Sequence, residues 1–169
     1  MAEKNKVIIY YPSYERGGAT NILINIINYL TQNNFEVFLF SQNVEKNKFR
    51  NIRYIRIINV QNSKFFLKVF ERTYLSFLLS IKMFFFLKKS REKINILSMQ
   101  NHLFSILISI ITNTKIIIRN SEDIFGATKF ADNKINGYLV LFLKLIFYQF
   151  AEKIVALSVK SRSSLKKII

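Results

Sequence analysis

Two adjacent glycines near the start of the chain form the segment best suited to hold a ligand. Gly17 and Gly18 stand between an apolar run, Val7 to Tyr11, and a helical pattern from Thr20 to Leu30. Glycine has no side chain, so a ligand can approach the backbone there, and the amides that begin a helix carry partial positive charge. With Arg16 beside them, these groups suit a diphosphate. A tight turn that needs glycine explains the pair equally well.

The glycine pair does not complete a known nucleotide-binding motif. The G-x-G-x-x-G and G-x-x-x-x-G-K-[ST] patterns are both absent from the sequence. The second expected strand ends in Phe40-Ser41-Gln42-Asn43, without the acidic residue of dinucleotide-binding folds. A dinucleotide site and a P-loop are therefore disfavoured.

His102 is the only histidine in the chain, and it follows the apolar run Ile94 to Ser98. If the strands are parallel, it lies on the same edge of the sheet as Gly17 and Gly18. There it suits a general base or a contact to a substrate hydroxyl. From the residues alone, a histidine that caps or packs at the start of a helix is the favoured interpretation.

A third polar cluster, Arg119 to Asp123, follows the apolar run Lys115 to Ile118. Arg119 suits an anion, whereas Ser121 or Asp123 suits the cap of a helix. The adjacent carboxylates of Glu122 and Asp123 would point in opposite directions along an extended chain, so they do not suggest a paired-carboxylate site.

The segment from Lys64 to Lys93 reads as one long helix or two shorter ones, and it is rich in Phe and Leu. Its basic residues suit an anionic membrane surface. A helix packed on the sheet with a solvated lysine edge is the alternative. The most apolar stretch, Tyr74 to Leu87, contains Lys82 and falls short of the about 20 residues that cross a bilayer. The basic residues that would contact the membrane are Lys64, Lys68, Arg72, Lys82 and Lys89.

The elements that must position these groups alternate between strands and helices. Further helices are expected from Leu103 to Thr112, Tyr138 to Phe150 and Lys160 to Ile169, with a polar loop from Arg119 to Gly137. Most strands are continuous apolar runs, which is typical of a parallel sheet covered on both faces. We predict a single α/β domain with a Rossmann-like, doubly wound parallel sheet. The remaining strands are expected at Glu36 to Phe40, Ile52 to Ile58 and Lys153 to Leu157.

The composition of the chain limits the classes of molecule that it is expected to bind. The chain carries 26 basic and 10 acidic residues, a net charge of +16, which attracts lipid head groups, nucleic acid or phosphorylated substrates. Part of this bias is also what A/T-rich codons produce. No recognition-helix, RNP or zinc-module pattern is present, so nucleic acid is not expected. The chain has no cysteine and one histidine, so we expect no metal site. We expect no cofactor either.

Three segments together resemble the N-terminal domain of GT-B glycosyltransferases of the family 4, retaining type. The first is Gly17-Gly18-Ala19 followed by an apolar helix and Asn34-Phe35-Glu36-Val37. The second is Ile94 to Ser98 with His102, and the third is Ala151 to Ser158, which resembles the family's "ad-x-ivavS" strand. Order and spacing agree over nearly the whole chain. Asn21 and the turn Asn33-Asn34 depart from the usual residues.

The resemblance implies a role for each cluster. Gly17, Gly18, Ala19 and Arg16 would contact the diphosphate of a nucleotide-sugar donor, and His102 would lie near the acceptor or the transferred sugar. The long basic helix would hold the enzyme at a membrane that carries a lipid-linked acceptor. The acceptor side of the cleft would be lined by Asn101, Arg119, Asn120, Ser121 and Glu122.

The resemblance also implies a second domain, which would hold most of the nucleotide and sugar contacts. The sequence ends at Ile169, inside an expected helix. The expectation is therefore an N-terminal half, residues 1–169, that transfers a hexose to a glycan only with a C-terminal half. It would work in the cytoplasm at the inner face of the membrane. The alternative is a non-catalytic, basic membrane-surface module.

Overall fold

The computed structural model describes residues 5–13, 17–42, 44, 49, 52–60, 71–90, 92–129 and 134–167. Arg16, Lys64 and Lys68 lie outside these residues, and the side chain of Arg72 is not described either. The roles predicted for these four side chains therefore stay predictions.

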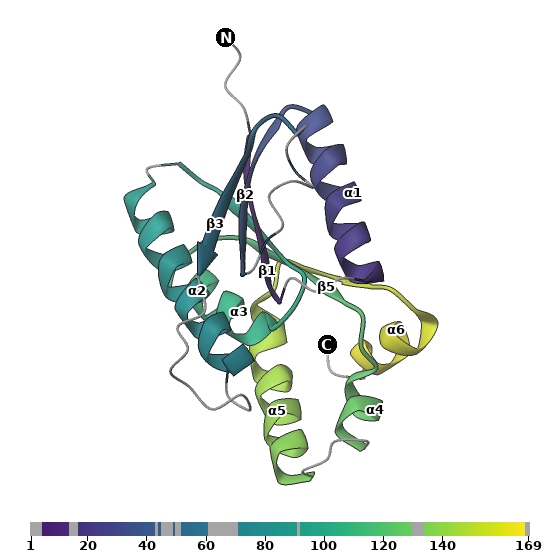
Figure 1. The fold of residues 1–169 in the computed structure, drawn as a ribbon. Helices are drawn as coiled ribbons and strands as arrows, with labels where there is room; N and C mark the ends of the chain where they lie inside the picture. Colours follow the sequence, from purple (N-terminus) through teal and green to yellow (C-terminus); the bar gives the residue numbers. More distant parts are fainter. Residues whose placement is uncertain are drawn as a thin grey trace.

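A parallel sheet forms the centre of the molecule (Figure 1). The described strands lie in the order β3-β2-β1-β4-β5-β6, and every neighbouring pair is parallel. The chain starts in the middle and moves outward first to one edge and then to the other, which confirms the predicted Rossmann-like, doubly wound fold. The strands are β1 (Asn5–Ser13), β2 (Phe35–Gln42), β3 (Ile55–Val60), β4 (Asn95–Ser98), β5 (Ile116–Asn120) and β6 (Lys153–Ala156).

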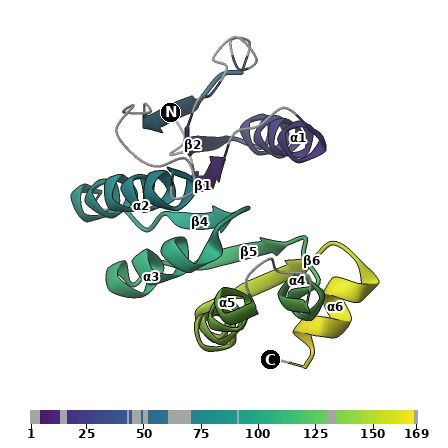
Figure 2. The same cartoon turned by 60° about the horizontal axis from the view of Figure 1, so that its bottom comes forward.

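Helices cover both faces of this sheet. The helix α1 (Gly18–Gln32) lies on one face, and α2 (Glu71–Lys89), α3 (His102–Thr112) and α5 (Lys134–Phe147) lie on the other (Figure 2). Near the end of the described chain stand the remaining helical segments, which are α4 (Ile124–Lys129), the 3-10 turn η2 (Tyr148–Phe150) and α6 (Val159–Leu165).

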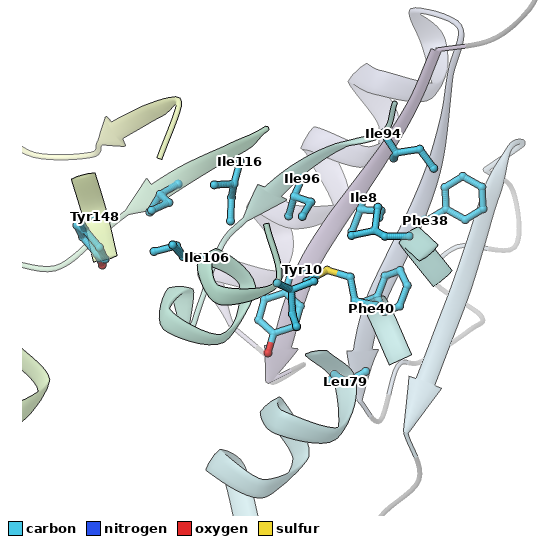
Figure 3. Close-up of a cluster of buried hydrophobic side chains, with 14 of the residues drawn as sticks. Ile8, Tyr10, Phe38, Phe40, Leu79, Ile94, Ile96, Ile106, Ile116 and Tyr148 are labelled. Carbon is cyan, nitrogen blue, oxygen red and sulfur yellow. The ribbon is translucent and has the colours of Figure 1, made fainter. Parts of the chain in front are cut away.

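The core has two layers because alternate strand residues point to opposite faces. Ile8 and Tyr10 of β1 join the layer under α2 and α3, which Figure 3 shows. Ile9 and Tyr11 join the layer under α1. Both faces are buried, which explains why the strands are continuous apolar runs and do not alternate with polar residues.

Asn34 and Tyr54, which precede the strands β2 and β3, adopt the left-handed backbone region. Asn34, where the resembled family has glycine, adopts φ 63°, a conformation that asparagine tolerates better than most residues. Tyr54 adopts φ 65° directly before β3. This turn explains why the strand begins at Ile55 and not at the predicted Ile52.

The predicted loop from Arg119 to Gly137 was partly wrong, because α4 and the first turn of α5 fall inside it. Glycine at positions 126 and 137 lowers the intrinsic helix propensity there. Ile124, the first residue of α4, is fully buried in the core. Tertiary packing of this apolar side chain therefore outweighs the local preference.

The helix α2 packs on the sheet as the alternative interpretation required. Leu75, Leu79 and Met83 are buried against the sheet, while Lys82 and Lys89 are exposed. Lys82 donates a hydrogen bond from Nζ to the carbonyl oxygen of Asn59 in β3, at 2.9 Å. Within the described residues, no helix combines the length and apolar character that crossing a bilayer requires.

Candidate functional site at the carboxyl edge of the sheet

The predicted site residues meet at one edge of the sheet. Gly17 and Gly18 follow β1, His102 follows β4, and Arg119 stands near the end of β5. Because β1, β4 and β5 are parallel neighbours, their carboxyl ends lie side by side. We call this edge, with the residues that follow these three strands, the carboxyl rim. The sequence prediction that these groups share one edge is confirmed.

The glycine turn leaves the start of α1 open. Gly17 has φ 156° and ψ −174°, a backbone conformation that is essentially restricted to glycine. It is the N-cap of α1, and no side chain caps the helix there. A Cβ atom built on Gly17 or Gly18 would meet no atom within 4 Å. The turn thus needs glycine at position 17, and position 18 leaves room for a ligand.

His102 is held at the first turn of α3. Its Nδ1 lies 2.9 Å from Oγ of Ser98, the last residue of β4, and Ser105 donates from Oγ to the same Ser98 oxygen at 2.7 Å. The imidazole edge also packs against the Tyr148 ring, with 6.1 Å between the ring centroids. Because the hydrogen bond with Ser98 occupies Nδ1, the other ring nitrogen, Nε2, is the one that can serve a ligand.

Desolvation keeps the half-buried His102 neutral. Desolvation lowers its pKa to about 4, the nearby positive charges of Lys144 and Arg119 act in the same direction, and Glu122 opposes them. At neutral pH the imidazole therefore carries no charge and can accept or donate one hydrogen bond. That chemistry suits a hydroxyl of a sugar better than it suits direct pairing with a phosphate. The packing interpretation of His102 and the ligand interpretation are both compatible with this geometry.

An ion pair stands beside the imidazole. Lys144 of α5 donates from Nζ to Oε2 of Glu122 at 2.8 Å, and the Lys144 side chain is largely buried. Burial raises the pKa of Glu122, but the charge and hydrogen bond of Lys144, together with His102, outweigh it and lower the pKa overall. Glu122 is therefore charged at neutral pH. Sequence reasoning missed Lys144, although a lone lysine inside an apolar helix was a usable signal.

Asn120 links three elements at the rim. Its Nδ2 donates to the Glu122 carbonyl oxygen at 2.8 Å and to Oγ of Ser161 in α6 at 2.9 Å. Its Oδ1 accepts from the Tyr148 hydroxyl at 3.5 Å. Both amide hydrogens are thus donated to protein groups, which favours a role in positioning Glu122. The predicted acceptor-side role of Asn120 stays a prediction.

The neighbouring predicted residues occupy the outer part of the rim. Ser121 is exposed beside Glu122. Asn101 is exposed at the N-cap of α3 in the left-handed region, with φ 48°, and its Nδ2 donates to Oγ of Ser76 at 2.8 Å. The third segment of the resemblance ends at Ser158, which caps α6 by accepting from the backbone N–H of Ser161 at 3.1 Å. Ser158 thus has the helix-starting place that the motif predicts.

Two pockets of about 390 and 420 Å³ lie away from the groups that could bind a ligand at the rim. The first is lined by Asn113, Lys115 and Glu152, beyond the opposite ends of the strands. The second lies between η2, β6 and α6. Neither is lined by His102 or Gly18. Among the described residues, no cluster of three or more His, Asp or Glu side chains is placed to hold a metal ion.

No protein-family model matches this sequence, and a search of curated proteins gave no match. Comparison with solved structures does give matches. The crystal structure of TcCGT1 in complex with UDP superposes with a TM-score of 0.53 at 11% identity, over 75% of this chain and 30% of that chain. UGT73P12 of Glycyrrhiza uralensis, complexed with glycyrrhetinic acid 3-O-monoglucuronide, superposes with a TM-score of 0.63 at 9% identity, over 98% of this chain and 47% of that chain.

At these identities the likeness concerns the fold alone. The chain spans less than half the length of either matched protein. With the strand order and the parallel pairing, these matches show that the described domain has the Rossmann-like, GT-B-like fold of glycosyltransferase chains.

Proposed function

We propose that this chain is the acceptor-side half of a GT-B glycosyltransferase that transfers a hexose from a nucleotide-sugar to a glycan acceptor. The observation that carries the proposal is the carboxyl rim, where the open start of α1 and the neutral His102 lie on one edge. The UDP bound by one structural neighbour supports a nucleotide-sugar donor. The family 4, retaining part of the proposal rests on the three sequence motifs, which contain Gly18, His102 and Ser158.

Each group at the rim then has a chemical role. Backbone amides at Gly18 and Ala19 would donate to the donor's diphosphate, which is the usual partner of an uncapped helix start. His102 would use Nε2 for a hydroxyl of the acceptor or the transferred sugar. The charged pair of Glu122 and Lys144 would orient the polar acceptor beside it. The other wall of the site would come from a second domain, and transfer needs both walls because the reacting groups must be held in register.

The first prediction concerns Gly18. We expect Gly18→Val to lower sugar transfer at least tenfold when the chain is fused to or co-expressed with a GT-B C-terminal domain, because the new side chain occupies the space above the first turn of α1. Transfer is measured with a panel of radiolabelled nucleotide-sugars. Asn25→Val, which places the same side chain on an exposed position of α1, is the control and should retain activity.

The proposal fails if neither arrangement of the two halves transfers sugar from any donor in the panel and if Gly18→Val changes nothing. Gly17 is not used for this test, because any side chain at its φ of 156° strains the backbone whether or not a ligand binds.

Membrane attachment is the second part of the proposal, and the structure favours α5 over α2 as the contact. Leu75, Leu79 and Met83 of α2 are buried against the sheet, whereas none of the apolar residues of α5 is fully buried. An apolar helix face exposed on a strongly basic chain suits the interface of an anionic bilayer. Of the predicted basic positions, Lys82 and Lys89 lie on α2 and are exposed. The exposed apolar residues of α5 are Ile135, Tyr138, Leu139, Val140, Phe142 and Ile146.

The second prediction tests this surface. We expect the double variant Leu139→Ser, Phe142→Ser to weaken binding to phosphatidylglycerol-containing vesicles at least tenfold, because the two side chains are 56% and 58% exposed and would lose their burial in lipid. Vesicle sedimentation measures it. Phe85→Ser is the matched control, since Phe85 of α2 is 65% exposed and should contribute little.

Binding should also fall with added salt and with neutral lipid. Loss of vesicle binding in Phe85→Ser but not in the double variant would show that α2, and not α5, contacts the membrane. Strong vesicle binding without transfer by any two-domain arrangement would favour the non-catalytic membrane module.

A further inference from the structure

Arg119 is buried without a counter-ion. It is the second-last residue of β5, and its exposed fraction is only 9%. Within the part of the chain that the structure describes, its guanidinium has no hydrogen bond and no ion pair. The described ion pairs of Lys6, Lys115 and Lys144 all join a glutamate. Burying a charge that nothing compensates is strongly unfavourable, so a retained arginine in such a place requires an explanation.

Arg119 lies on the α1 side of the sheet, at the same edge as the start of α1. Ile118 belongs to the core layer under α2 and α3, so Arg119, the next residue along β5, points to the face that α1 covers. The Tyr11 phenol, on that same face, interacts electrostatically with Arg119. The Tyr11 hydroxyl also lies 3.3 Å from Oγ1 of Thr20, in the first turn of α1.

The Arg119 guanidinium and the first turn of α1 both favour an anionic ligand. The helix α1 is 15 residues long, and no side chain caps its N-terminus. Its first turn therefore presents amides to an anion. Arg119 supplies the full positive charge and the forked donor geometry that match phosphate oxygens. The open space over Gly18 leaves room for such a group.

We infer that Arg119 and the first turn of α1 together form a phosphate-binding site. The inference rests on the proposed function for the nature of the ligand, a phosphate linked to a sugar. That phosphate belongs either to the donor's diphosphate or to a phosphorylated acceptor, and both have the chemistry that the site recognises. Arg119 is then a binding residue, and the bound phosphate supplies the negative charge that pairs with its guanidinium.

The test uses the full 169-residue chain and sodium pyrophosphate as the probe. Isothermal titration should show pyrophosphate binding to the wild type and at least tenfold weaker binding to Arg119→Met. Thermal unfolding without any ligand should give a higher Tm for Arg119→Met than for the wild type, because methionine fills the site without a charge. Arg119→Lys keeps the charge but not the fork and should bind with intermediate affinity. Arg162→Met, on the exposed surface of α6, should bind as the wild type does.

UDP and glucose 1-phosphate, titrated separately, distinguish the two sources of the phosphate. Tighter binding of UDP assigns the site to the donor, and tighter binding of glucose 1-phosphate assigns it to the acceptor; either result supports the site. A lower Tm for Arg119→Met together with unchanged pyrophosphate affinity would overturn it, as would a wild type that does not bind pyrophosphate. Phosphate binding that depends on Arg119 without sugar transfer would contradict only the proposed function. Sugar transfer that Arg119→Met leaves unchanged would contradict only the site.

Discussion

Lowering the pH from 7 to 4 is expected to destabilise the folded chain by up to about 3 kcal/mol through His102 alone. The imidazole has a pKa of about 4 in the fold, against an ordinary value of 6.5. As the pH falls through 6.5, the unfolded chain binds a proton that the folded chain still excludes. The free energy of unfolding therefore decreases between pH 6.5 and pH 4, and it has no contribution from this group above that range.

Urea unfolding at several pH values in the wild type and in His102→Asn measures this effect. Asparagine can still hydrogen-bond to Ser98, but it does not titrate. His102 is the only histidine, so the difference between the two pH profiles isolates one group. The pKa of Glu122 is lowered in part by His102, so its titration differs between the two variants below its usual value near 4.5. The comparison is therefore made from pH 6.5 to pH 5, where identical slopes would contradict the neutral imidazole.

Replacing Asn120 with alanine is expected to lower the free energy of unfolding by about 2–3 kcal/mol. The side chain is 1% exposed and bonds to Glu122, Ser161 and Tyr148, so its removal leaves polar groups of three elements without their partner. Chemical denaturation measures the change. Gln149→Ala is a suitable control, because that amide is exposed and its hydrogen bond goes to the Leu145 carbonyl oxygen, four residues earlier in the chain.

A loss below about 0.5 kcal/mol in Asn120→Ala would show that water replaces these bonds, and that Asn120 is free to serve a ligand as the resemblance implies. A loss of about 2–3 kcal/mol in the free energy of unfolding would show that Asn120 stabilises the structure of the carboxyl rim.

Much of the fold follows from local pattern. The apolar run at β1, the helical pattern of α1 and the run at β2 predict a parallel unit, because strands that are buried on both faces read as continuous apolar stretches. The failures also have local causes. Tyr54 takes a left-handed turn before β3, which its residue type does not announce. The helix α4 forms in a segment with low helix propensity because Ile124 reaches the core.

The candidate site was predictable only in part. Gly18, His102 and Arg119 were placed on one edge, because the carboxyl ends of parallel strands meet there. Their partners were not predictable. Lys144 comes from α5, and the Asn120 amide bonds to Ser161, 41 residues further along the chain.

The sequence by itself determined the alternation of strands and helices, the edge of the sheet where polar residues gather, and the glycine that the turn at position 17 requires. Only the tertiary structure decided that Lys144 is paired while Arg119 has no ion pair among the described residues, and that α5 exposes more of its apolar side chains than α2 does. The physical reason is that strand and helix periodicity act over a few neighbouring residues. Charge pairing and burial depend on distances between segments that are far apart in the chain.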